Sequence, residues 1–449
     1  MELATLLILP WLAVVPIYFL RRVRFLAAAL SLGVLTLQAR AVQSISLDRG
    51  TTFLGLEMVV DLPSRALLLL TLAATAFLVI LTWRSAGDEL LPAVAPALVA
   101  LAGMALLVQS TVVAGTWLIL LAMASMLLVP RPVLVGSAAA LKPLAVTAPA
   151  FVCFVLVAGW EQTYQLNPDF TYLPDRMAAV WGLAFAAILA VVPFHLVVPD
   201  LGHGRITGLV YALALVDGVA LIQVLRLLGS RPWLPPLAIP WLLAIGAITA
   251  LVGGLLAPGQ DRLGRIVAYS AIADLGFLVV GVGTATTLGL TGVVLQMSSR
   301  ILTLSLLAAT VATIRRHAPD DRLSALGGLA RALPWTTGGL VVGALAIAGL
   351  PPTLGFVGRL LILEALSPTE QLLRAGLVVS MAGVSLAYVR VGGALFGAPR
   401  RPTGTVWGEP AAILTLALAL VMVALGLYPN PLLAAAQDVV QRLAFFSGT

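Results

Sequence analysis

Cysteine, histidine and charged side chains are scarce in this sequence. Charged residues make up 10% of the 449 residues, and the chain holds three histidines and one cysteine, Cys153. One cysteine excludes an internal disulfide and every multi-cysteine iron–sulfur or zinc site, and three histidines leave little for haem or metal ligation. We therefore expect no catalytic centre, no metal and no cofactor in this chain.

Lysine is almost absent as well. Among the 26 lysine and arginine residues, Lys142 is the one lysine, and the formal net charge is +7. In a strongly apolar chain, an excess of arginine in the loops reports membrane topology. We expect no nucleic-acid partner.

Long apolar runs dominate the chain. Hydrophobic residues make up 61% of it, and the mean hydropathy is +1.07. Apolar runs of about 18 residues or more recur throughout, which predicts an all-α polytopic membrane protein. A transmembrane barrel is disfavoured because runs such as residues 411–428 do not alternate with period two. Residues 2–20 have no basic residues before them and no cleavage site after them, so we interpret them as a helix and not as a signal peptide.

These runs predict about 14 transmembrane helices in a single integral-membrane domain over residues 1–449. The span 334–367 is too long for one crossing of about 20 residues, so Pro351 and Pro352 should divide it into two half-helices. The expected spans are 2–20, 24–43, 62–83, 90–109, 111–129, 134–158, 178–198, 206–228, 237–257, 262–284, 288–316, 334–367, 370–396 and 411–428.

Arginine is distributed unevenly between the predicted loops. Loops after odd-numbered helices hold 14 arginines, whereas loops after even-numbered helices and the C-terminal tail hold 6. The positive-inside rule places the odd-numbered loops in the cytoplasm. We therefore expect both termini on the outer side of the membrane.

Two predicted helices carry proline in mid-membrane. The seventh contains LAVVPFHLVVPD at residues 189–200, and the twelfth contains AIAGLPPTLGFVGR at residues 346–359. Paired broken helices that enter the membrane from opposite sides are typical of inverted-repeat transporters. We therefore predict two inverted five-helix repeats with broken helices 7 and 12, an N-terminal repeat over residues 90–228 and a C-terminal repeat over residues 237–396.

Several ionisable side chains fall within the predicted spans, where a charge at the bilayer centre costs about 2.5–3.5 kcal/mol. Carboxylates, lysine and histidine can carry protons, whereas arginine keeps its proton and suits a fixed counter-charge. The alternative is a set of buried ion pairs that hold helices together, Asp274 with Arg300 for example. The proton-path candidates are Lys142, His195, Asp217, Asp274, Arg300, Arg359 and Glu364.

Other charges have simpler interpretations. Glu364 follows Arg359 by five residues, roughly 140° around a helix, so the two need not share a face, and Glu364 is expected to mark the outer end of its helix. Arg390 also falls within a predicted span. Asp61 and Arg65 lie near a helix end, from which their side chains can reach the interface.

Three motifs carry a family resemblance. VVPFHLVVPD at 191–200 looks like a Pro-Phe-His-x-Trp-x-Pro-Asp break, RIVAYSAIADLGF at 265–277 like an Arg-Leu-Leu-Ala-Tyr-Ser-Ser-Ile stretch, and GLPPTLGFVGR at 349–359 like a Gly-Leu-Pro-Pro-x-x-Gly-Phe-x-x-Lys break. In this order they resemble the antiporter-like membrane subunits of respiratory complex I, which are related to the large subunits of Mrp-type cation/proton antiporters. The resemblance implies two inverted five-helix repeats with a half-channel in each.

The N-terminal repeat departs from this family at its charged positions. Trp117 stands where the family has the helix 5 glutamate, and Ile188 stands where it has the helix 7 lysine. Lys142 lies near the position at which the family has the basic residue that opens helix 6. Because neither tryptophan nor isoleucine can take up a proton, we expect the two side chains to pack against apolar neighbours in a dry first half.

The C-terminal positions depart as well. The family has a lysine or histidine in helix 8 and another after the Tyr-Ser-Ser-Ile stretch. In this sequence Asp217 and Asp274 stand at these two positions, so the charge is reversed. The His-x-x-x-Lys pattern of helix 11 becomes Gln296 and Arg300, and the helix 12 lysine becomes Arg359. We expect the four charged residues of this set to line one continuous polar axis near mid-membrane.

By this resemblance the chain is a membrane-arm subunit of a complex I-like energy-converting oxidoreductase that contributes to proton translocation or supports it structurally. The alternatives are a Mrp-type cation/proton antiporter subunit and a non-conducting scaffold subunit. The implied partners are other membrane subunits of such an assembly and lipids. The implied location is a bacterial inner membrane or a thylakoid-type energy-converting membrane.

Overall fold

The computed structural model describes residues 2–83, 89–128, 144–202, 204, 206–318, 320–398 and 410–443. The chain divides into two compact units. Unit 1 contains Met1–Leu189, Tyr211–Ala238 and Arg442–Thr449, and unit 2 contains Ala190–Val210 and Ile239–Gln441. The predicted boundaries of the two repeats, 90–228 and 237–396, stay predictions.

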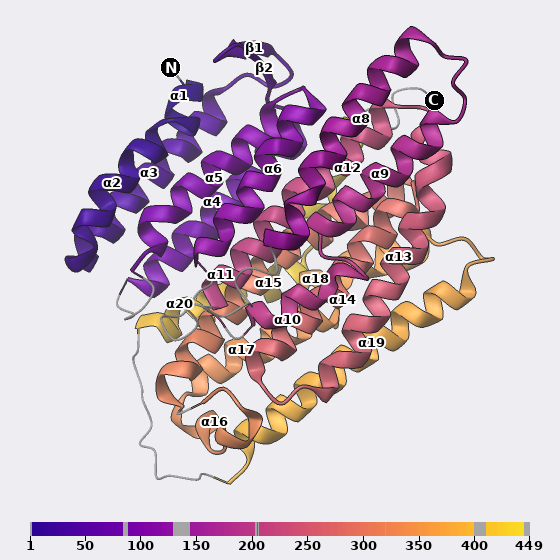
Figure 1. Cartoon of the computed structure of the whole chain (residues 1–449). Coiled ribbons are helices and arrows are strands. Elements are labelled where there is room, and N and C mark those ends of the chain that lie inside the picture. The colour runs from indigo at the N-terminus through magenta and orange to yellow at the C-terminus, as the bar shows by residue number, and fades with distance from the viewer. Residues whose placement is uncertain are drawn as a thin grey trace. The chain divides into compact units, whose positions relative to one another are not determined.

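Unit 1 is helical apart from one hairpin. Asp61 begins α4 as its N-cap, since its carboxylate accepts from the Ser64 backbone N–H at 3.0 Å, and α2, α3, α4 and α5 pack side by side (Figure 1). Its elements are α1 (Glu2–Leu7), α2 (Leu9–Phe19), 3-10 helix η1 (Leu20–Arg22), α3 (Arg24–Ser44), β1 (Gly50–Phe53), β2 (Leu56–Val59), α4 (Leu62–Thr82), α5 (Leu91–Leu107), α6 (Thr111–Ser125), 3-10 helix η2 (Met126–Leu128), α8 (Pro149–Leu166), α9 (Leu173–Ile188), a π-helical turn (Tyr211–Val216) and α12 (Asp217–Ser230).

Unit 2 is built around α14 and α15. Its elements are 3-10 helix η4 (Phe194–Leu196), α10 (Val197–Leu201), α11 (Ile206–Val210), most of α13 (Leu234–Leu256), 3-10 helix η6 (Ala257–Gly259), α14 (Leu263–Gly283), α15 (Thr287–His317), 3-10 helix η7 (Leu323–Ala325), α16 (Leu329–Ala332), α17 (Pro334–Ala348), α18 (Leu354–Ala365), α19 (Gln371–Phe396), α20 (Pro410–Leu427) and α21 (Asn430–Gln441). In Figure 1, α13, α14 and α19 run alongside one another.

Ten helices among the described residues are long and apolar enough to cross a membrane, and a bent pair, α20 with α21, brings the number to 11. The prediction of a helical polytopic membrane protein is confirmed. The exact number of 14 and the inverted relation of the repeats stay predictions. The α20–α21 pair bends by 75°, and Ala436 of α21 is buried against Leu295 and Leu354.

Both predicted breaks are present. α9 ends at Ile188 and α10 begins only at Val197. α17 ends at Ala348 and α18 begins at Leu354, with five residues between the two helices. Breaks are tolerated in apolar surroundings only where other groups take up the freed backbone hydrogen bonds. At the first break the Val192 N–H donates to the Thr249 hydroxyl at 3.2 Å.

Three elements differ from expectation. The predicted span 134–158 begins outside the described residues, and the helical run there continues to Leu166. The polar residues near its end made the apolar run look shorter, but Glu161 is paired with Arg231 at 2.8 Å. The hairpin β1–β2 and the helix α21 were not predicted, because a four-residue strand and a short amphipathic helix give no long apolar run.

Candidate functional site

One buried carboxylate in unit 2 is held by three side chains. Arg300 Nη1 donates to Asp274 Oδ2 at 2.7 Å, and Arg359 Nη2 donates to Asp274 Oδ1 at 2.8 Å. The Gln296 side-chain amide also donates to Asp274 Oδ1. The charged side chains are only 1–2% exposed, so the site is withdrawn from solvent and lipid.

Helical periodicity and the second break bring these groups together. Gln296 and Arg300 are four residues apart on α15 and therefore share one face. Arg359 lies on α18, beyond the break, and donates to the Ile347 carbonyl at 2.6 Å in the last turn of α17. A cation at the C-terminal end of a helix satisfies a free carbonyl and interacts favourably with the helix dipole.

Backbone geometry makes room for the Arg359 side chain. Gly349, which ends α17, has a φ of +72°, and a Cβ at this position would collide with the Arg359 side chain. The guanidinium carbon of Arg359 also lies 4.5 Å from the centroid of the Phe277 ring. A cation–π contact of this kind contributes more when it is desolvated, so Arg359 is fixed by a ring, a carbonyl and a carboxylate.

Two guanidinium groups, those of Arg300 and Arg359, face the Asp274 carboxylate. Arg359 Nε and Nη1, Ser299 Oγ and Thr303 Oγ1 are buried and have no hydrogen-bond partner within the described residues. Buried polar groups of this kind are usually satisfied by ordered water. Asp274 is the one member of the Asp274, Arg300 and Arg359 triad that can accept a proton, since arginine remains protonated in proteins.

The structure brings together three of the predicted candidates, namely Asp274, Arg300 and Arg359, and the ion pair that we expected between Asp274 and Arg300 is present. Glu364 is exposed near the end of α18, while Arg359 is buried, as their angular offset indicates. Lys142 lies outside the described residues. That these residues carry protons stays a prediction.

Two further candidates lie elsewhere. His195 is buried in η4 at the first break, and its Nδ1 has no hydrogen-bond partner in the part of the chain that the structure describes. Asp217 in unit 1 is buried at the start of α12, directly after the π-helical turn. Such π turns are frequent at functional sites. That Asp217 lies on one polar axis with the Asp274 cluster stays a prediction.

Unit 1 contains aromatic packing close in sequence to Trp117 and Ile188. Phe154 of α8 fills the space over Gly115 of α6, where an added Cβ would lie 2.7 Å from the ring. The Phe154 and Phe185 rings meet edge to face, with their centroids 5.5 Å apart. Trp117 is half-buried and Ile188 is buried; their expected packing against each other stays a prediction.

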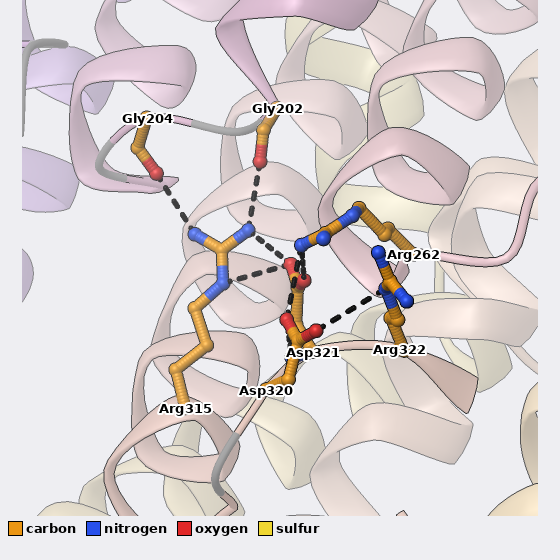
Figure 2. Close-up of polar contacts among 7 residues, drawn as sticks. All are labelled: Gly202, Gly204, Arg262, Arg315, Asp320, Asp321 and Arg322. Carbon is orange, nitrogen blue, oxygen red and sulfur yellow. Dashed lines mark hydrogen bonds and ion pairs between the residues drawn. The ribbon is translucent and has the colours of Figure 1, made fainter. Parts of the chain in front are cut away.

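A second polar cluster, which sequence reasoning missed, joins the segment after the first break to α15 (Figure 2). Arg315 donates to the carbonyls of Gly202 and Gly204 at 2.7 and 2.9 Å and to Asp321 Oδ2 at 2.5 Å. Arg262 bonds to Asp321 at 3.1 Å. The available signal in the sequence was the adjacent pair Asp320 and Asp321, which is flanked by Arg315, Arg316 and Arg322.

Asp321 lies outside the apolar spans, and its charge state is set by these arginines. Burial raises the pKa of the Asp321 carboxyl, but the positive charge and hydrogen bonds of Arg315 and the charge of Arg262 outweigh burial and leave that pKa below its usual value. The carboxylate is therefore a permanent anion at neutral pH.

Three charged side chains near helix ends each have a partner. Arg390 was expected within a span, but its guanidinium bonds to Gln260 O at 3.3 Å and to the exposed Asp261 at 3.4 Å, because a long side chain can reach the interface. Asp61 pairs with Arg226 at 2.6 Å, and Arg65 donates to the Ile45 carbonyl.

The fold defines a polytopic helical membrane protein with broken helices and a buried ion triad. Comparison with known proteins shows what the chain is similar to. Residues 175–385, just under half of the chain, match the model described as NADH:quinone oxidoreductase/Mrp antiporter, TM, so the chain is similar to antiporter-like membrane subunits.

Relatives and solved structures are also similar to this chain. The chain is 32% identical over 317 residues to NADH-quinone oxidoreductase subunit N of Chromohalobacter salexigens, an alignment that covers 65% of each, so it spans less than two thirds of that relative. It matches a chain of respiratory complex I from Thermus thermophilus with a TM-score of 0.76 and 23% identity, covering 97% of this chain and 99% of the other. It matches a chain of the Mrp complex from Dietzia with a TM-score of 0.83 and 19% identity, covering 99% and 97%. At these identities the two structures show the fold alone.

Proposed function

We propose that this chain is a membrane-arm subunit of a complex I-like energy-converting oxidoreductase. In this proposal it supports proton translocation by neighbouring membrane subunits and does not carry protons through unit 2. In this proposal electron transfer belongs to partner subunits, in keeping with the single cysteine and three histidines of this chain. The uneven distribution of arginine supports a location in a bacterial inner membrane or a thylakoid-type membrane, with both termini outside.

The observation that carries the proposal is the clamped carboxylate of Asp274. A proton carrier must alternate between its charged and neutral forms. Arg300 and Arg359 keep their own protons and stabilise the ionised carboxylate through charge-assisted hydrogen bonds. A proton that bound Asp274 would break these hydrogen bonds. The geometry therefore favours a structural role, in which Asp274, Arg300 and Arg359 stay charged and hold their helices together; we call this arrangement the ion lock.

The test replaces the whole triad by apolar side chains of similar size. In the assembled complex, Asp274→Leu, Arg300→Met and Arg359→Met are introduced together, and protons pumped per electron are measured in proteoliposomes. We expect normal assembly and normal pumping, because apolar replacement of a buried ion triad is often neutral or stabilising. Normal assembly with lowered pumping would instead show that Asp274 carries protons.

A proton relay that includes Asp217 of unit 1 or Asp274 of unit 2 is the second candidate function. His195 Nδ1, Ser299 Oγ and Thr303 Oγ1 are buried without partners in the described structure, and this supports sites for relay water. A relay requires that Asp217→Asn or Asp274→Asn lower pumping while the complex stays assembled. An Mrp-type antiporter would instead exchange cations for protons in vesicles without any electron donor, although Trp117 and Ile188 at the family's charged positions weigh against this activity.

A further inference from the structure

A cavity of about 610 Å³ opens beside the second polar cluster of unit 2. It lies where η6 meets the first turn of α14, against the segment that leads into η7. Its polar lining residues are Gln260, Asp261, Arg262, Arg265, Arg322 and Ser324. This cavity is separate from the Asp274 triad, which is fully buried.

Three guanidinium groups face this cavity, and they are incompletely paired. Arg265 Nε is buried and has no hydrogen-bond partner among the described residues. Arg322 is 60% exposed and is held by Asp320 at 3.3 Å. The backbones of Arg262 and Arg322 form an antiparallel bridge, and Asp320 contacts both guanidinium groups.

The aspartates nearby do not balance the arginines. Figure 2 shows Asp320 and Asp321 turned toward the guanidinium groups of Arg262, Arg315 and Arg322. Asp261 is 83% exposed and is engaged by Arg390 at 3.4 Å. The lining of the cavity itself holds three arginines and one aspartate, Asp261, and its net positive charge fits one further anion.

Apolar surface continues from the cavity along two helices. α13 and α19 pack closely, since a Cβ at Gly383 would collide with the Gly254 carbonyl. Leu255 and Leu256 precede Gly259 of the cavity lining by four and three residues, and Val389 precedes Arg390, which bonds to Gln260; all three apolar side chains are exposed. A charged cavity beside an apolar face at the end of membrane spans matches a molecule with an anionic head and apolar chains.

We propose that this cavity binds the phosphate group of an anionic phospholipid, whose acyl chains lie along α13 and α19. Arg265 and Arg322 donate to the phosphate oxygens, because guanidinium groups form directional, charge-assisted hydrogen bonds with phosphate. Asp320 keeps Arg262 and Arg322 oriented toward the phosphate.

The experiment uses the full chain in a nonionic detergent and follows thermal unfolding by tryptophan fluorescence. Three probes are titrated separately: short-chain phosphatidylglycerol, inorganic phosphate and a short-chain diacylglycerol without phosphate. A ligand that binds the folded state raises the midpoint in a concentration-dependent way. We expect this shift with phosphatidylglycerol, and we expect Arg265→Gln and Arg322→Gln each to weaken the affinity about tenfold.

The matched control is Arg331→Gln on α16. Arg331 is exposed and lies outside the cavity lining, so its removal should leave the phosphatidylglycerol affinity unchanged. Because Arg322 is largely exposed, Arg322→Gln should fold even if Arg265→Gln does not. If inorganic phosphate raised the midpoint as much as phosphatidylglycerol does, and the same variants lost this shift, the cavity would be a phosphate site but not a lipid site. Stabilisation by diacylglycerol alone, or equal affinity in all variants, would overturn the proposal.

Discussion

Arg359 and Asp274 are 85 positions apart in the sequence, yet Arg359 Nη2 lies 2.8 Å from Asp274 Oδ1 in a fully buried site. The same Nη2 bonds to the Ile347 carbonyl in the last turn of α17. One guanidinium therefore ties a broken helix to the carboxylate of α14. The cation after the two prolines is explained by this geometry: it satisfies the carbonyl end that the break exposes.

Removal of the Asp274 charge alone should be severe. Asp274→Asn leaves two buried guanidinium groups without their anion, and loss of one member of a buried ion pair costs about 3–5 kcal/mol. We expect a lower thermal midpoint of the purified chain and less assembled complex. Asp261→Asn is the control, because Asp261 is 83% exposed and exposed pairs contribute about 0–1 kcal/mol. Equal behaviour of the two variants would contradict the ion lock.

The break after α17 should tolerate no side chain at Gly349. Gly349→Ala places a Cβ at a φ of +72° and against the Arg359 side chain, and the left-handed conformation alone costs about 1–2 kcal/mol. We expect a lower thermal midpoint. In the same helix, Gly338 has no neighbour within 4 Å of an added Cβ. Gly338→Ala should therefore leave the midpoint unchanged or raise it; a loss of stability in this variant equal to that of Gly349→Ala would refute the explanation.

Asp321 should make stability depend on acid pH. Its pKa is lowered in the folded chain, so its contribution is complete above the unfolded value of about 3.9 and is lost as the pH falls through the folded value. We expect the unfolding midpoint to fall below about pH 4. Asp321→Asn should be less stable at neutral pH and should show a weaker acid dependence, measured as midpoint against pH. A parallel pH profile in both proteins would exclude this role.

Truncation of the aromatic packing in unit 1 should lower the stability of the chain. Phe154→Ala removes the ring that covers Gly115 and meets Phe185, and loss of a buried phenylalanine costs about 3–5 kcal/mol. The neighbouring Val155 is 48% exposed, so Val155→Ala should change the thermal midpoint little. If Phe154→Ala were as stable as Val155→Ala, unit 1 would contain more free space than its packing indicates.

Much of the fold followed from the sequence. Apolar runs located most helices to within a few residues, because membrane spans leave a strong hydropathy signal, and the prolines at 193 and 351 located both breaks. The hairpin β1–β2 and the helix α21 gave no such signal. The sequence did not show that a helix continues through Glu161, because Arg231, which neutralises the charge of Glu161, is far away in the sequence.

The candidate site was only half predictable. The cost of a charge in an apolar span singled out Asp274, Arg300 and Arg359, and charge complementarity suggested the first pair. The contribution of Phe277 and of the Ile347 carbonyl depends on the angle at which α18 leaves the break, which periodicity does not give. The Arg315 cluster was missed because its acceptors include the carbonyls of Gly202 and Gly204, and carbonyls carry no sequence signal.

α14 and α15 are fastened to each other at two levels. Asp274 meets Arg300 in the middle, and at the ends the Leu263 N–H donates to the Asp321 carbonyl while Arg315 holds the Asp321 carboxylate. On α15 the two fastenings are 15 residues apart, or about 22 Å along the axis. Two sets of contacts at this separation oppose both sliding and rotation of α15 against α14. This helix pair should therefore move as a single rigid body.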